Sequence, residues 1–428
     1  MKIFDQIKKA CLLLVVFAVS LTACNKLELD ATPNERPADG TTPTLATLLD
    51  DPSFSLLKAL VTKSGLIPVF ATPSVRYTLF APDDNAITAS LAPILPPGVT
   101  SEMYIASLDA GSAKSIVEYH TVPQVIPAAS IPGTFPNFQY PTLLNPAPAV
   151  SALLRLTTFP SVRSNGAWVN NIPIVGTDIK AVNGVMHKVA RLILPPSQDI
   201  WAKINGDPKL TYLKAAINRA DSGVAKGSRL VDAISIDSNT AAIGSNLTLF
   251  APNDSAMKVF LTGSITLALI NQGLDPATAQ GQATFLVATY GTLLISNPAA
   301  ISPALAVALS PSTVKGLLAY HILSSQTIKF LPPGIRVFSV NLPITASPVK
   351  TLLNSGGVAY PTYPNDPVTN HPGLTVQATF VSIAPGVSVV SSATVKGLAN
   401  TSASNLVNMD IHCVNGVMHK IDQVLRPQ

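Results

Sequence analysis

Four short motifs occur twice in this chain, in the same order, and this duplication limits the available folds more than any other feature. The paired motifs begin at Asp51 and Asp207, Thr78 and Thr248, Tyr119 and Tyr320, and Val182 and Val414. The offset between the paired motifs grows along the chain from 156 to 232 residues. An ordered repeat of this kind predicts one domain present twice, with insertions in its second copy.

The duplication also predicts the domain boundaries. We expect the first repeat over residues 44–196, ending at a Pro-Pro pair, and the second repeat, with its insertions, over residues 197–428. A chain of 428 residues is long enough for two domains of this size. An apolar content of 47% with only 12% charged residues excludes wholesale disorder.

An acidic residue follows a short apolar strand in each repeat. The strands are predicted over residues 77–80 and 247–250, and each ends at Ala-Pro. We expect Asp84 and Asp254 to be the N-caps of the helices that follow, because a carboxylate there accepts from the free N–H groups of the first turn. A catalytic carboxylate pair is disfavoured, because the residue before Asp254 is Asn253.

Near the end of each repeat, an Asn-Gly pair lies between two apolar strands. Asn183-Gly184 and Asn415-Gly416 predict two-residue hairpins with type I′ turns, in which both turn residues have φ > 0.

Histidines recur in both repeats. His187 and His419 alternate with apolar residues on their strands, which favours buried, hydrogen-bonded core residues over metal ligands, since neither has a nearby ligand set in the sequence. The alternative is a metal site that joins His120 and His187. We expect no metal and no cofactor.

The ordered motifs resemble the fasciclin domain, present twice over residues 44–428. The resemblance lies in the Phe-Ala-Pro-x-Asp segment, the Tyr-His pair and the Val-Asn-Gly-Val-x-His segment. It implies an α+β fold, in which each of two tandem domains is a β-sandwich wedge with a helical layer, and a role in cell adhesion or matrix contact. In some animal relatives the Tyr-His motif contributes to adhesion, so the resemblance makes Tyr119-His120 and Tyr320-His321 candidate binding residues. Packing of these residues against the core is the alternative.

The second repeat contains a Pro- and Gly-rich insertion at residues 355–375, which includes Tyr360, Tyr363 and His371. Exposed tyrosines on a stiff loop offer contact area at a low entropic cost. We therefore expect Tyr360 and Tyr363 to be candidate contacts for a glycan or protein partner. The alternative is a loop that packs on its own sheet.

The N-terminus resembles a bacterial lipoprotein signal peptide over residues 1–23. Three lysines precede a short apolar stretch, and Leu21-Thr22-Ala23-Cys24 resembles a lipobox. The apolar stretch is too short to span a membrane, so we expect cleavage, lipidation of Cys24 and a flexible tether over residues 24–43. Only Cys413 would remain as a thiol, and its apolar surroundings predict that it is buried and inert.

Two acidic residues behind the lipidation site, Glu28 and Asp30, loosely resemble the sorting signals of surface-exposed lipoproteins in Bacteroidetes. We therefore expect an outer-membrane lipoprotein of the cell envelope. Display on the cell surface and a periplasm-facing position both remain open.

The sequence lacks the common catalytic motifs, among them Gly-x-Ser-x-Gly, His-Glu-x-x-His and Gly-rich phosphate loops. Its net charge of +5 is not clustered, so nucleic acid is not an expected partner. We expect a lipid-anchored adhesion or surface-binding protein that is not an enzyme, with a cell-surface protein or glycan as its ligand. The alternative is a glycan-binding accessory lipoprotein of a polysaccharide-uptake system.

Overall fold

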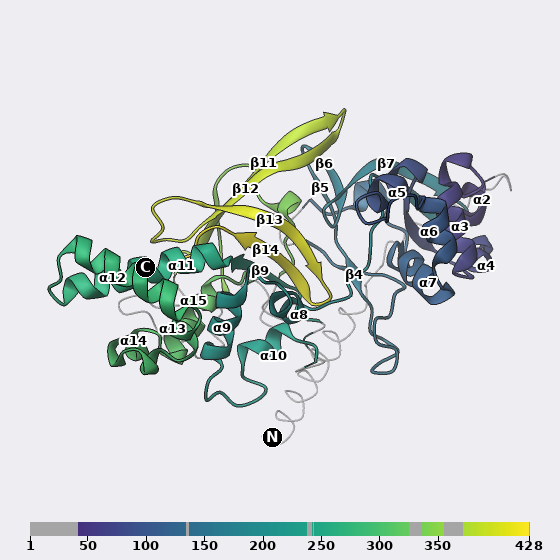
Figure 1. Ribbon diagram of the computed structural model, residues 1–428. Helices are drawn as coiled ribbons and strands as arrows, with labels where there is room; N and C mark the ends of the chain where they lie inside the picture. Colours follow the sequence, from purple (N-terminus) through teal and green to yellow (C-terminus); the bar gives the residue numbers. More distant parts are fainter. Residues whose placement is uncertain are drawn as a thin grey trace, which may run out of the picture. The chain divides into compact units, whose positions relative to one another are not determined.

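Each repeat folds as a set of helices combined with a six-stranded sheet, as the computed structural model in Figure 1 shows. The structure describes residues 42–133, 137–237, 242, 244–324, 335–354 and 371–427. Residues from Thr44 onward belong to one compact unit. The prediction of two tandem α+β domains is confirmed, whereas the exact boundary between the repeats stays a prediction.

The first repeat places most of its helices before its strands. Its helices are α2 (Leu45–Leu48), α3 (Ser55–Lys63), α4 (Ile67–Ala71), α5 (Asp84–Leu91), α6 (Ser101–Ser107) and α7 (Ala110–Tyr119). Its strands are β1 (Tyr77–Pro82), β2 (Thr121–Val122), β3 (Tyr140–Pro141), β4 (Thr157–Thr158), β5 (Pro160–Arg163), β6 (Gly166–Val169), β7 (Ile172–Ala181) and β8 (Gly184–Val189).

The second repeat has the same order with longer elements. Its helices are α8 (Ile200–Asn205), α9 (Thr211–Ala220), α10 (Leu230–Ile234), α11 (Asp254–Asn271), α12 (Pro276–Tyr290), α13 (Leu293–Ser296), α14 (Pro303–Ala308) and α15 (Pro311–Tyr320). Its strands are β9 (Leu247–Pro252), β10 (Ser347–Val349), β11 (Leu374–Ala384), β12 (Val387–Lys396), β13 (Ser404–Cys413) and β14 (Gly416–Ile421).

The two sheets share the order of five of their six strands, and they differ in the sixth, which is β2 beside β1 in the first sheet and β10 beside β11 in the second. Their strand orders are β2-β1-β8-β7-β6-β5 and β10-β11-β12-β13-β14-β9. In each sheet the first long strand pairs in parallel with the last strand, β1 with β8 and β9 with β14, and the other pairs are antiparallel. The duplication predicted from the motifs is therefore visible in the strand pairing.

The insertions of the second repeat extend existing elements and add the short helices α13 and α14. Helix α11 has 18 residues where α5 has 8, and α12 has 15 where α6 has 7. Strands β11 and β12 have 11 and 10 residues, whereas β5 and β6 have 4 each. The long β11–β12 hairpin is visible in Figure 1.

Amphipathic helices build the core of each repeat. Leu56, Leu57, Leu60 and Val61 are the buried face of α3, at the spacing of one side of a helix. The corresponding helix α9 buries Leu213, Ala216, Ile217 and Ala220 in the same way. Within the described residues, no helix combines the length and apolar character that a membrane crossing needs.

The Asn-Gly pairs differ from the expectation of type I′ turns. Because Ala181 pairs with Gly184, the two loop residues are Val182 and Asn183, and the glycine is the first residue of β8. The side-chain oxygen of Asn183 accepts from Leu45 N at 2.9 Å, and its amide nitrogen donates to the carbonyl oxygen of Phe70 at 2.7 Å. The asparagine thus ties the hairpin to two helices.

The glycine is needed because a neighbouring strand approaches it closely. A Cβ atom on Gly184 would collide with the carbonyl oxygen of Tyr77 in β1, and one on Gly416 would collide with the carbonyl oxygen of Leu247 in β9. Asn415 corresponds to Asn183, and its side-chain oxygen accepts from Ile200 N at 3.0 Å. In both repeats, the Asn-Gly pair therefore allows the two parallel strands to lie close together. The geometry of the turn does not explain why the pair is present.

We expect Gly184→Ala to lower the free energy of unfolding by about 1–3 kcal/mol, because the methyl group must push two paired strands apart. The measurement is urea unfolding followed by circular dichroism. The matched control is Gly281→Ala in α12, where a Cβ has no neighbour within 4 Å, so that the change should be neutral or slightly stabilising. Equal stability of the two variants would contradict this account of Gly184.

Candidate functional site

Asp84 and Asp254 cap helices other than the ones predicted. The N-cap of α5 is Asp83, which accepts from Ala86 N at 2.9 Å. Asp84 instead accepts from Leu56 N at 2.8 Å, at the start of α3. Asp254 accepts in the same way from Tyr212 N of α9, at 3.0 Å. The prediction failed because this cap is a tertiary contact between helices, which local spacing does not reveal.

The tyrosines of the Tyr-His pairs lie in the core. Tyr119 and Tyr320 are both 0% exposed, and burial raises the pKa of each to about 12. The Tyr320 hydroxyl donates to Gly373 O at 2.6 Å and accepts from Leu398 N at 3.0 Å. A direct contact with a partner needs these side chains at the surface, so the structure favours packing over binding.

The histidines of the same pairs are saturated with hydrogen bonds. His120 Nδ1 donates to Ile116 O at 2.8 Å, and its Nε2 accepts from Ile193 N at 2.9 Å. His321 makes the same two bonds with Leu317 O and Leu425 N. Both ring nitrogens are in use, so no lone pair remains for a metal or a substrate.

His187 and His419 are fully buried and stack on Phe80 and Phe250, with ring centroids 5.8 and 5.7 Å apart. The Nε2 of each ring donates to a backbone carbonyl oxygen, at 2.8 Å for His187 and 2.9 Å for His419. Both ring nitrogens of His120 and Nε2 of His187 are therefore already in hydrogen bonds. These atoms are not free to bind a metal ion, which disfavours the alternative of a metal site between His120 and His187.

An aspartate that the sequence analysis missed holds each of these rings. Asp178 N donates to His187 Nδ1 at 3.2 Å, and Asp410 N donates to His419 Nδ1 at 3.1 Å. The two aspartates have φ values of 57° and 58°, a conformation that Asp tolerates better than most residues. Asp-Ile precedes the Val-Asn-Gly motif in both repeats, and this extension of the repeat was the available signal.

The remaining candidates divide between described and undescribed residues. Tyr360, Tyr363 and Cys24 lie outside the described residues. His371 is buried, and its ring lies edge-on to Tyr320 with centroids 5.1 Å apart. Cys413 is buried, and burial raises the pKa of its thiol to about 12. Among the described residues, no group of three or more His, Cys, Asp or Glu could hold a metal ion.

The two repeats meet in a buried apolar cluster, which we call the junction. It contains Phe159 and Trp168 of the first repeat and Phe338, Val340 and Val417 of the second. Trp168 is 0% exposed, and its indole N–H donates to Ser388 O of β12 at 3.2 Å. An apolar cluster of this kind holds the repeats together by removing large aromatic surfaces from water.

A buried arginine from the second repeat lies beside this cluster. Arg336 is 4% exposed, and its Cζ lies 5.1 Å from the centroid of Phe159. One terminal nitrogen donates to His412 Nε2 at 3.0 Å and the other to Val414 O at 3.0 Å, and Nε has no partner among the described residues. Burial lowers the pKa of Arg336 to about 10.

His412 joins this arginine to the first repeat. Its Nε2 lies 3.4 Å from the Tyr119 hydroxyl. Loss of hydration and the Arg336 cation hold the pKa of His412 well below 6.5. His412 is therefore neutral at pH 7, as its role as hydrogen-bond acceptor for an arginine requires.

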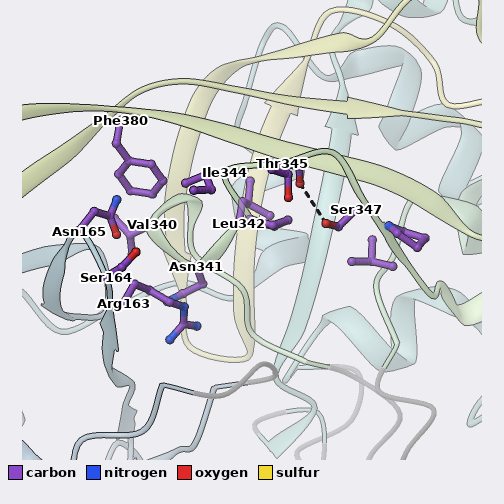
Figure 2. A pocket seen from close by; sticks show the side chains of 13 residues that line it. Arg163, Ser164, Asn165, Val340, Asn341, Leu342, Ile344, Thr345, Ser347 and Phe380 are labelled. Carbon is purple, nitrogen blue, oxygen red and sulfur yellow. Dashed lines mark hydrogen bonds between the residues drawn. The ribbon is translucent and has the colours of Figure 1, made fainter.

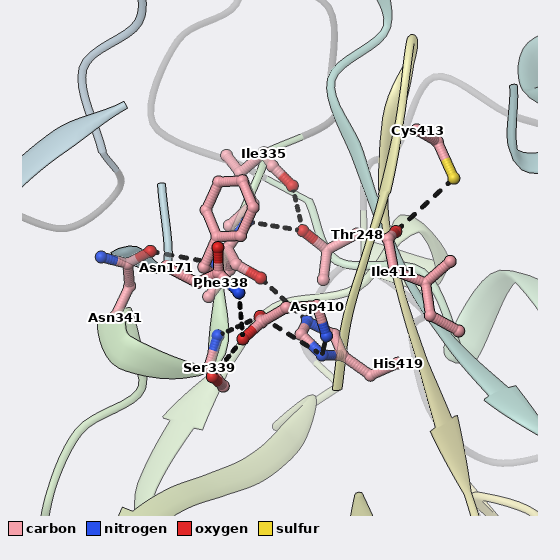
Figure 3. Close-up of polar contacts among 11 residues, drawn as sticks. Asn171, Thr248, Ile335, Phe338, Ser339, Asn341, Asp410, Ile411, Cys413 and His419 are labelled. Atoms are coloured by element: carbon pink, nitrogen blue, oxygen red, sulfur yellow. Dashed lines mark hydrogen bonds and ion pairs between the residues drawn. The ribbon is translucent and has the colours of Figure 1, made fainter. Parts of the chain in front are cut away.

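A second polar group crosses the junction (Figure 3). The Asp410 carboxylate accepts from Ser339 N at 2.7 Å and from Ser339 Oγ at 2.5 Å. Asn171 of the first repeat donates to the same carboxylate at 3.3 Å. The aspartate that holds His419 thus also links the two repeats.

Residues 52–195 match the model of the Fasciclin domain. The matched segment covers most of the first repeat, which is therefore similar to the Fasciclin domain. In the second repeat, five of the six sheet strands have the same order as in the first.

Two relatives and one solved structure are similar to this chain. "Protein sll1483" of a Synechocystis strain is 25% identical over 178 residues, which are 42% of this chain and 87% of that protein. The "Transforming growth factor-beta-induced protein ig-h3" of Sus scrofa is 27% identical over 169 residues, 36% of this chain and only 20% of that protein. A structure titled as a FAS1 domain pair from the insect cell adhesion molecule Fasciclin I is 13% identical, with a TM-score of 0.26, and the match covers 89% of this chain and 94% of that one.

We expect acid to destabilise the protein between pH 6.5 and 4. Burial lowers the pKa of His120 and His321 from 6.5 to about 4, so in this range the unfolded state binds protons that the folded state excludes. Stability is therefore lost as the pH falls, by roughly 2 kcal/mol per histidine at pH 5. The measurement is urea unfolding at pH 7 and pH 5.

His120→Gln should reduce the loss between pH 7 and pH 5 by that amount, because glutamine does not titrate. The control is Arg76→Gln at an exposed arginine, which should leave the loss unchanged. An unchanged pH dependence in His120→Gln would contradict the assignment of the effect to this ring.

We expect Trp168→Ala to cost about 3–5 kcal/mol in the free energy of unfolding, because it leaves a cavity in the junction. Phe138→Ala is the control, since Phe138 is 59% exposed and its loss should change stability by less than about 1 kcal/mol. Chemical unfolding measures both. Similar losses in the two variants would show that the junction contributes little.

Proposed function

We propose that this chain is a lipid-anchored protein of the cell envelope that acts in adhesion or surface binding, without catalysis. The observation that carries the proposal is the match of residues 52–195 to the Fasciclin domain, followed by a second repeat in which five of the six sheet strands have the same order. The family supports adhesion or binding. The anchor, the location and the ligand are parts of the proposal itself.

The anchor rests on the N-terminal sequence. Cleavage before Cys24 would leave a lipid on that residue and a tether over residues 24–43. A flexible tether of this length has an end-to-end distance of roughly 25 Å, and fully extended it reaches up to about 70 Å. In this proposal, the two repeats stay close to the outer membrane, and cell-surface display places them where partners can reach them.

The absence of catalysis is supported by how the motif histidines are used. His120, His187, His321 and His419 each have both ring nitrogens in hydrogen bonds with the backbone. A general base needs a nitrogen that can reach a substrate proton. The glycan-binding alternative depends on Tyr360 and Tyr363, which lie outside the described residues, so no structural observation favours it.

We expect Cys24→Ser to move the protein from the membrane fraction to the soluble fraction, because it removes the lipidation site. Cys413→Ser is the matched control, and it should leave the protein in the membrane fraction since Cys413 is a buried thiol. Fractionation with immunodetection measures both. A Cys24→Ser protein that stays with the membrane would contradict lipid anchoring.

Protease treatment of intact cells tests the surface position. Loss of the protein, with a periplasmic marker intact, is the expected result. Full protection would contradict surface display and adhesion between cells. Binding of cells to beads coated with the protein, compared with beads coated with the Trp168→Ala variant, then tests whether the folded pair of repeats is adhesive.

A further inference from the structure

A cleft lies where the first repeat meets the second (Figure 2). Its volume is about 400 Å³, within the range of pockets that hold small organic ligands. The β5–β6 turn of the first repeat lines one part of it, through Arg163, Ser164 and Asn165. The second repeat supplies residues 340–345 and 347–349 and the ring of Phe380.

The part of the cleft from the second repeat is mostly apolar. Leu342 is 3% exposed and Val349 is 9% exposed, so both form its inner wall. Ile344 is 61% exposed and forms its rim. An apolar ligand body of moderate size gains free energy here by leaving water.

The part from the first repeat is polar and carries positive charge. Arg163 is half-buried, and its guanidinium donates to Val162 O at 2.8 Å and to Asn137 Oδ1 at 3.2 Å. The side-chain nitrogen of Asn165 is buried and has no hydrogen-bond partner among the described residues. A buried donor without an acceptor destabilises the protein, and an acceptor on a ligand would remove that cost.

None of the described residues that line the cleft is acidic. The lining therefore combines a cation, an amide donor that lacks an acceptor and an apolar wall. A carboxylate suits the first two, because it carries a negative charge and only accepts hydrogen bonds.

We infer that this cleft binds a small organic carboxylate with an apolar body, its carboxylate toward Arg163 and Asn165 and its apolar body against Leu342, Val349 and Phe380. The site is distinct from the motifs of the repeats, and it exists only because the two repeats are joined. It does not depend on the proposed adhesion function, which can fail without affecting it.

The test is calorimetric titration of the full chain with decanoate, below its micelle concentration. Saturable binding with one site per chain is expected, together with a rise in melting temperature, since the ligand binds the folded state. Acetate, which lacks the apolar body, should not bind detectably. Absence of saturable decanoate binding would overturn the inference.

Two variants locate the site. Arg163→Gln should weaken decanoate binding at least tenfold and leave the binding of decan-1-ol unchanged, because only the carboxylate uses the charge. Ile344→Asp, at the exposed rim, should also weaken decanoate binding at least tenfold, and it keeps the test decisive if Arg163→Gln does not fold.

The matched controls are Arg76→Gln and Val307→Asp, since Arg76 is exposed and Val307 is 76% exposed. Both should bind decanoate like the unmodified chain. Decanoate binding that is unchanged in Arg163→Gln and Ile344→Asp, or that is equally weakened in the controls, would show that the anion binds elsewhere and would overturn the assignment.

Discussion

The parallel contact between the first long strand and the last strand of each repeat organises the whole structure. It brings the Phe-Ala-Pro strand beside the strand of the Val-Asn-Gly-Val-x-His motif, so that Phe80 pairs with His187 and Phe250 with His419. Parallel pairing needs a long crossover, and here nearly the whole repeat is that crossover. The glycine that begins each last strand allows this close approach. The histidine on the same strand donates to a loop carbonyl, Ile126 O for His187 and Val337 O for His419.

Burial of the Arg336 cation at the junction costs free energy, and the apolar cluster of the junction offsets this cost. Among the described residues, Arg336 donates to His412 and to the Val414 carbonyl and not to a carboxylate, and its Nε has no acceptor. Desolvation of such a cation is expensive, and the ring of Phe159, the carbonyl of Val414 and neutral His412 offset only part of that cost. The aromatic cluster around Trp168 supplies the remainder through burial of apolar surface. The arginine therefore fixes the orientation of the repeats more than it strengthens their association.

The duplication and the α+β class could be predicted from the sequence because both follow from ordered motifs and periodicity, which are local properties. The roles of Asp84 and Gly184 could not, since each acts on a backbone group that is distant along the chain, Leu56 for Asp84 and Tyr77 for Gly184. The same limit applies to Tyr119: helical spacing places it at the flank of α7, and only the packing of β4 and the second repeat shows that it is buried. The junction and the cleft lay beyond prediction, because they join residues that are far apart in the sequence, such as Trp168 and Phe338.

The differences between the repeats explain how a duplicated domain acquires a joint site. The motif histidines make the same kind of backbone hydrogen bonds in both copies, so they do not distinguish the pair from a single repeat. Lys180, which is exposed, corresponds through the repeat to His412, which accepts from Arg336. The lengthened β11–β12 hairpin supplies Phe380, which meets Trp168 with ring centroids 5.9 Å apart and also lines the cleft. One residue difference and one longer hairpin thus supply contacts between the repeats that have no counterpart inside a single repeat.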